Sequence, residues 1–191
     1  MTYRQDLWQV AVEHHGVVTT AQAEDAGVPA VELRKLAARG ALTRVGHGVY
    51  HHSGVPVDDW TEPAATLATV GANAFLDGDT VLAMFDLALV NPAQVHVGTP
   101  TAIRRKVPKH VDVEVRSVPD VDLTSYAGLR AVRVGRALLD AVGHLLAERV
   151  IEAVTEAERR DLIDEAEARA ILDAVARRRE ALASAESVSS P

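Results

Sequence analysis

The spacing of apolar residues along the first fifty positions changes from a helical period to a strand period. Residues 4–15 carry apolar side chains at three- and four-residue intervals, which is typical of a helix with one buried face. Shorter helices are expected over 21–26 and 29–39, separated by a glycine turn. Residues 42–45 and 48–51 are rich in strand formers and flank a Gly-His-Gly turn, which indicates a hairpin. Three helices followed by a hairpin predict a winged helix-turn-helix.

The remaining chain has the pattern of a second, mixed domain. Three runs alternate apolar and polar residues, over 94–98, 110–117 and 129–134. Each is expected to be a strand with one buried face. The helices expected in this part of the chain cover 61–70, 80–89, 138–149, 150–160 and 165–179.

These elements predict an α+β fold. A winged helix-turn-helix over 1–53 is followed by a mixed α/β domain over 54–183 that ends in helices. The last residues, 184–191, are rich in serine and are expected to form a flexible tail.

Composition excludes several classes of protein. With 48% hydrophobic residues in 191, the chain has ample material for a core. It has no cysteine, which excludes disulfides, zinc–thiolate sites and a thiol nucleophile. No apolar run approaches ~18 residues, and the N-terminus lacks the pattern of a signal peptide. We therefore expect a cytoplasmic protein that does not enter the membrane.

The net charge of −7 runs against the basic surface that nucleic-acid-binding proteins usually carry. The acidic excess lies outside the predicted winged helix, because residues 1–53 contain five Arg or Lys and five Asp or Glu. A neutral domain can still bind DNA if its cations face one way.

Three motifs follow one another within the predicted winged helix. They read G-V-V-T-T-A-Q-A-(x3)-G over 16–27, L-(x2)-L-(x3)-G-x-L over 33–42 and R-V-G-H-G-V-Y over 44–50. Together they resemble the N-terminal domain of AbiEi-type antitoxins, which belong to bicistronic type IV toxin–antitoxin systems. Residues 134–140 and 150–163 are more loosely similar to the C-terminal helical pattern of that family. The three N-terminal motifs cover about a quarter of the chain and are moderately specific for this family.

The resemblance implies an antitoxin that binds repeats in its own promoter and represses the operon. It also implies that the C-terminal domain counteracts a nucleotidyltransferase-like toxin encoded alongside. Direct binding, modification of the toxin and action on a shared target all remain open as the means.

Positions within the winged helix suggest which side chains meet double-stranded DNA. Residues 29–31, the apolar first turn of the third helix, would approach base edges, where they can contact thymine methyl groups. Cations of that helix would reach base edges or phosphates, and polar groups at the start of the second helix would bind phosphate. The predicted DNA-binding set is Thr20, Gln22, Arg34, Lys35, Arg39, Arg44 and His47. The alternative is that these cations lie on an exposed helix face and contact only water.

A second cluster of cations lies between two predicted strands, in an otherwise acidic region. It consists of Arg104, Arg105, Lys106 and Lys109. It is either a solvated loop or a second surface that contacts DNA or the toxin.

Catalytic and metal-binding interpretations are weaker. Asp112 and Glu114 share one face of a predicted strand, as in some nucleases, but any solvated strand face has this spacing. The histidine pairs at 14–15 and 51–52 point in different directions, so neither pair suits a metal. We expect no catalytic residue, no metal and no cofactor. The alternatives left open are a winged-helix regulator with a ligand-sensing C-terminal domain, a nuclease and a protein-modifying antitoxin.

Overall fold

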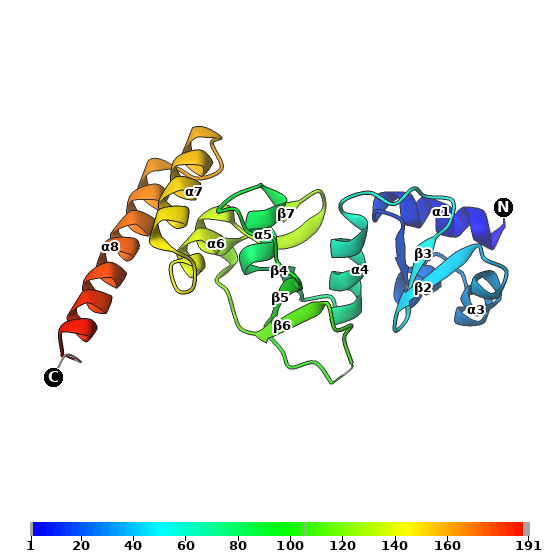
Figure 1. Cartoon of the computed structure of the whole chain (residues 1–191). Coiled ribbons are helices and arrows are strands. Elements are labelled where there is room, and N and C mark those ends of the chain that lie inside the picture. Colours follow the sequence, from blue (N-terminus) through cyan, green and yellow to red (C-terminus); the bar gives the residue numbers. More distant parts are fainter. Residues whose placement is uncertain (1, 105, 189–191) are drawn as a thin grey trace. The chain divides into compact units, whose positions relative to one another are not determined.

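The computed structural model of the chain describes residues 2–104 and 106–188 (Figure 1). It is a mixture of helices and strands that ends in helices, as the predicted fold class requires. The chain divides into two units. The first takes in the described residues up to Phe75 together with Val97–Ser117 and Ser125–Arg130. The second takes in Leu76–His96, Val118–Thr124 and the described residues from Ala131 onward.

The N-terminal part of the first unit, here called the head (residues 3–52), is the expected winged helix-turn-helix (Figure 1). Its strands pair antiparallel in the order β1-β3-β2, and strand β1 is the one element that the sequence pattern did not predict. The elements are α1 (Tyr3–Glu13), β1 (Val17–Thr19), α2 (Thr20–Asp25), α3 (Ala30–Ala38), β2 (Leu42–Gly46) and β3 (Val49–His52).

Both faces of the head sheet are covered. Val18 and Tyr50 lie opposite one another and pack into a core with helix residues such as Leu7 and Leu33, which are fully buried. The next residues along each strand point the other way, so Val17 packs with Val49 against α4 (Thr61–Val70). Burying a side chain of this size stabilises the fold by roughly 1.5–3 kcal/mol.

The five-stranded sheet has the order β6-β5-β4-β8-β7, and β4 and β8 run parallel. The strands expected over 94–98, 110–117 and 129–134 are present with slightly different ends, whereas β7 was not predicted. The bounds are β4 (Phe75–Leu76), β5 (Val95–Thr99), β6 (Val111–Val115), β7 (Leu123–Tyr126) and β8 (Leu129–Val132), with a 3-10 turn, η1, over Asp120–Asp122.

Two helix predictions in the second unit were wrong in their bounds. The helix expected over 80–89 is α5 (Gly78–Met84); it stops early because Asp86, just past the C-cap, adopts a left-handed backbone conformation, as do Ala88 and Leu89. The helix expected over 138–149 is α6 (Val134–Ala141), which ends before a turn. Its buried stripe begins at Val134, a residue that the alternating pattern assigned to the preceding strand.

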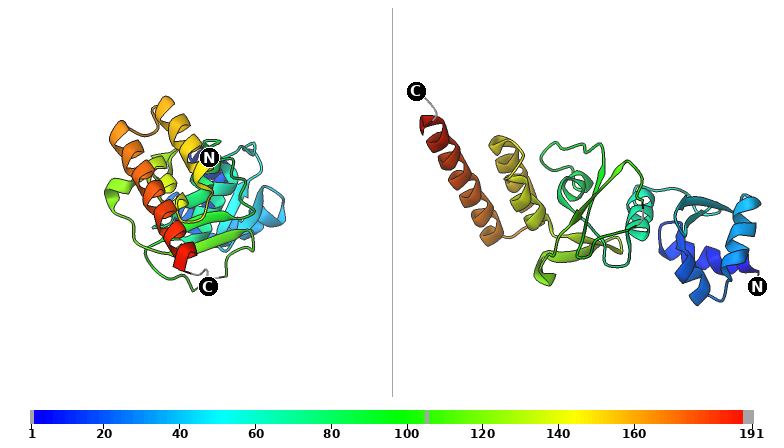
Figure 2. Two further views of the ribbon diagram at one scale, coloured as in Figure 1. Left: turned by 60° about the vertical axis from the view of Figure 1, so that its left-hand side comes forward. Right: turned by 90° about the horizontal axis from the view of Figure 1, so that it is seen from below.

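The chain ends in a helical hairpin. Helices α7 (Ala147–Arg159) and α8 (Glu165–Val188) lie side by side, as Figures 1 and 2 show. Helix α8 continues into the segment expected to be a flexible tail, and residues 189–191 of that segment lie outside the described residues. Nowhere in the described chain is a helix both long enough and apolar enough to cross a bilayer.

Candidate nucleic-acid interface

Helix α3 presents one complete face to solvent. Leu33 is fully buried in the head core, while the opposite side of the helix is exposed at intervals of three and four residues. We call this surface the reading face; it consists of Val31, Arg34, Lys35 and Ala38. In a helix-turn-helix, this is the helix that enters the major groove of DNA.

The two cations of the reading face differ in their partners. The Lys35 ammonium lies 2.7 Å from the carboxylate of Glu32, one turn earlier in the same helix. Arg34 makes no side-chain hydrogen bond or ion pair with any residue that the structure describes, so its five N–H donors are open to a ligand. Arg39, just after the helix, is also exposed.

Arg44 lies on the same side of the head as α3. It pairs across the strands with Tyr50, whose ring faces the helices. Helix α3 contacts β2, so this exposed arginine lies on the strand next to that helix. Its Nε–H donates to the Gly46 carbonyl oxygen at 3.1 Å, which holds the stem and leaves the outer guanidinium nitrogens to reach a phosphate.

The other predicted DNA-contacting residues line a cavity instead. Thr20, Gln22 and His47 contribute to the wall of a cavity of about 760 Å³ in the first unit. The Thr20 hydroxyl donates to the Gly48 carbonyl oxygen at 3.2 Å. The Gln22 side-chain oxygen accepts a hydrogen bond from the Thr19 backbone N–H at 2.9 Å. The predicted set is thus split between two surfaces. A phosphate contact by Thr20 and Gln22, and a contact of His47 on the wing with the DNA backbone or minor groove, stay predictions.

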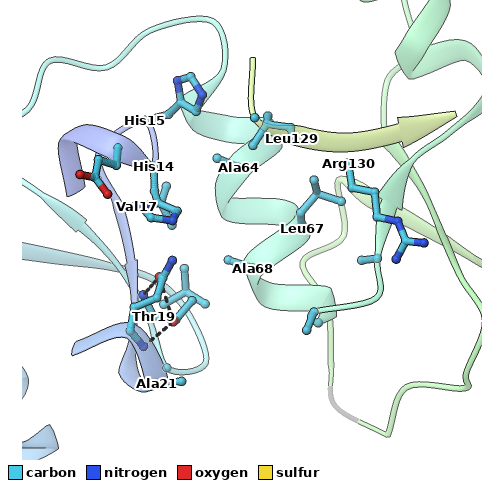
Figure 3. A pocket seen from close by; sticks show the side chains of 18 of the residues that line it. His14, His15, Val17, Thr19, Ala21, Ala64, Leu67, Ala68, Leu129 and Arg130 are labelled. Atoms are coloured by element: carbon cyan, nitrogen blue, oxygen red, sulfur yellow. Dashed lines mark hydrogen bonds between the residues drawn. The ribbon is translucent and has the colours of Figure 1, made fainter. Parts of the chain in front are cut away.

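Figure 3 shows the two sides of this cavity. Val17, Thr19 and Ala21 of the head face Ala64 and Leu67 of α4. The turn between β7 and β8, residues 127–128, and the first two residues of β8 complete the wall. The cavity was not predictable from the sequence, because its sides come from segments that are far apart in the chain and carry small apolar residues without a motif.

His15 connects the end of α1 to two other segments of the first unit. Its Nδ1 lies 3.2 Å from a carboxylate oxygen of Asp58, and its Nε2 lies 2.7 Å from the Ala127 carbonyl oxygen. Both oxygens only accept hydrogen bonds, so both bonds form together only when both ring nitrogens carry hydrogen. Burial raises the pKa of Asp58, but hydrogen bonds from His15, Thr61 and the Trp60 backbone outweigh it and leave the pKa below its ordinary value.

The basic cluster lies between β5 and β6, in the same unit as the head. Arg104, Lys106 and Lys109 are exposed there. Arg105 lies outside the described residues. Arg104 also lines a small cavity of about 380 Å³ together with Asn73 and Thr101. Whether this cluster is a binding surface or a solvated loop stays open.

The candidate nuclease residues Asp112 and Glu114 are exposed on β6. Among the described residues, no three His, Asp or Glu side chains gather closely enough to hold a metal ion. His52 is buried in the head, where Nδ1 accepts the Gly54 N–H at 3.0 Å and Nε2 donates to the Arg4 carbonyl oxygen at 3.3 Å. Burial lowers its pKa, and both nitrogens are occupied by the fold.

Comparison with known proteins agrees with the geometry of the head. A family model described as "Transcriptional regulator, AbiEi antitoxin" matches residues 5–50. This match covers all three helices and the hairpin of the winged helix up to Tyr50. The chain matches none of the curated proteins. Over residues 5–50, this chain is therefore similar to the AbiEi antitoxin family of transcriptional regulators.

Proposed function

We propose that this chain is an antitoxin that binds double-stranded DNA in its own promoter and represses its operon. The observation that carries the proposal is the reading face of α3, where Arg34 and Lys35 lie exposed on the third helix of a winged helix-turn-helix. Arg44 on the adjacent strand adds a cation beside it. We further propose that the rest of the chain counteracts a nucleotidyltransferase-like toxin, and that it does so without being an enzyme.

The proposed mode of binding follows from the partners of each cation. Helix α3 lies in the major groove, and Arg34 reaches base edges because nothing in the described chain holds its guanidinium. Lys35, Arg39 and Arg44 contact phosphates and fix the position of the helix. Phosphate contacts supply affinity for any sequence, and base contacts supply the preference for the promoter.

The test is binding of the full chain to its own upstream DNA, measured by fluorescence anisotropy at several salt concentrations. Changing Arg34→Ala and Lys35→Ala together should weaken binding at least about tenfold, because two charge-assisted contacts are lost. Arg169→Ala is a control, since that arginine is also exposed but lies on α8. Absence of specific binding, or equal binding by the double variant, would overturn the proposal.

A separate double variant tests the part of the proposal that concerns the toxin. Changing Arg104→Ala and Lys106→Ala removes two exposed cations from the basic cluster. If the cluster serves the toxin, neutralisation of the toxin in cells is lost while promoter affinity is unchanged. If promoter affinity falls instead, the cluster is a second DNA surface.

The cavity favours a second candidate function, regulation of DNA binding by a small molecule. Its volume of about 760 Å³ lies within the range of roughly 300–1,000 Å³ found for ligand sites. Its wall includes the turn of the wing, so a ligand there would touch an element that positions DNA. Filling the cavity with Ala68→Phe tests this: an effector-dependent change in promoter affinity should disappear, while binding without effector remains.

A further inference from the structure

The fold of the head does not require a valine at position 31 of α3. Val31 is 47% exposed, on the solvent side of the helix between two charged neighbours in space, Arg34 and Lys35. A β-branched residue slightly lowers the propensity to form a helix. At an exposed position, burial of the side chain offsets little of that cost. The head core is completed from the other side of the helix by Leu33 and, partly buried, Leu36.

The place of Val31 on the reading face gives it a natural partner in DNA. It lies in the first turn of α3, which is the end of a recognition helix that approaches base edges most closely. Arg34 follows three residues later on the same face. In the major groove, thymine alone among the four bases presents a methyl group, and guanine presents two acceptors that suit arginine.

We propose that Val31 makes the head selective for thymine, by packing its methyl groups against the C5-methyl of one thymine while Arg34 binds a guanine nearby. This inference rests on the proposed DNA-binding function and names the base chemistry that the same surface reads. It assigns sequence preference to an apolar residue and affinity to the surrounding cations.

The experiment uses duplexes that the full chain selects from a random pool, in which thymines are replaced one at a time by deoxyuridine. Deoxyuridine lacks only the C5-methyl group. At one thymine of the bound site, the replacement should weaken binding about fourfold, which corresponds to the ~0.8 kcal/mol of one buried methylene-sized group. At all other thymines, binding should be unchanged.

The variant Val31→Ala provides the second arm. Alanine is a better helix former and Val31 is exposed, so the variant should fold, which a thermal melt verifies. It should bind thymine and deoxyuridine duplexes equally, because the methyl partner is gone. Val12→Ala is the matched control: that valine is 50% exposed on α1, away from the reading face, and its removal should leave the fourfold preference intact.

The outcomes separate this inference from the function on which it rests. If no duplex is enriched from the pool, the DNA-binding function itself fails. If duplexes are enriched but no deoxyuridine replacement weakens binding, the role of Val31 is wrong. It is equally wrong if Val31→Ala keeps the preference for thymine.

Discussion

At the scale of single residues, the availability of a cation depends on its neighbours in the same helix. Glu32 is only partly exposed and holds the Lys35 ammonium at 2.7 Å, whereas Arg34 has no such partner within the described chain. An ion pair on the surface contributes little to stability, with a median of about 0–1 kcal/mol. Its larger effect here is to keep a cation from a phosphate.

Glu32→Gln should therefore strengthen DNA binding. The change frees Lys35 and removes a negative charge that the DNA backbone repels. We expect an increase of a few-fold in promoter affinity at low salt that shrinks as salt rises, because exposed charges are screened. Anisotropy titrations of both proteins in parallel would show it. Weaker binding by Glu32→Gln would mean that Glu32 itself contacts the DNA, and unchanged binding would mean that Lys35 does not.

His52 makes the stability of the head depend on pH. Burial lowers its pKa below the ordinary value of 6.5, so the unfolded chain binds the proton at a higher pH than the folded one does. Its contribution to stability is fully present above pH 6.5 and falls as the pH drops through and below that value, by at most about 1.4 kcal/mol per pH unit. Urea unfolding followed by tryptophan fluorescence between about pH 7.5 and about pH 5.5 measures this slope.

Two histidine variants show whether that slope belongs to His52. His47→Ala removes an exposed histidine of the wing and should keep the wild-type slope. His52→Gln should be less stable at neutral pH and should lose most of the dependence. An unchanged slope in His52→Gln would assign the effect to another group.

At the scale of elements, helix α2 depends on a reciprocal cap. The Thr19 hydroxyl accepts the Gln22 N–H at 3.1 Å, and the Gln22 side chain accepts the Thr19 N–H at 2.9 Å. Gln22→Ala should lower the free energy of unfolding by about 0.5–1 kcal/mol through loss of this cap. Urea unfolding measures the change. Unaltered stability combined with weaker DNA binding would instead support the phosphate contact that the sequence predicts for Gln22.

Elements with local signals were predictable, and those defined by distant partners were not. The helices of the head follow from apolar spacing and from glycines at their ends, such as Gly27 and Gly40. Strand β1 has only three residues and exists because it pairs with β3, which lies thirty residues later. Helix α5 ends just before Asp86, which adopts a left-handed backbone conformation, as do Ala88 and Leu89, although the composition of this segment is compatible with a helix.

The same distinction applies to the candidate site. The sequence placed Arg34 and Lys35 on an exposed helix face, and the structure finds them there. It gave no sign that Glu32 holds Lys35 or that His47 borders a cavity, because both depend on side-chain directions.

At the scale of the whole molecule, a net charge of −7 would limit how tightly one copy holds DNA in the proposed complex. Arg34, Lys35, Arg39 and Arg44 are the exposed cations that we assign to the interface. If each neutralises one phosphate, the logarithm of the binding constant should fall with the logarithm of salt concentration at a slope of about −3.6. Replacing Arg39 by alanine should reduce the steepness by about 0.9. A slope near zero would exclude a phosphate-based interface.

The covered sheet of the head has a consequence for how the chain can be divided. Val17 and Val49 are buried by α4, which begins at Thr61, beyond the last strand of the winged helix. A shortened chain that stopped at residue 53 would turn this valine-lined surface toward water. Two such fragments would shield it by adhering to one another, so a dimeric fragment would reflect where the cut was made rather than how the intact regulator assembles.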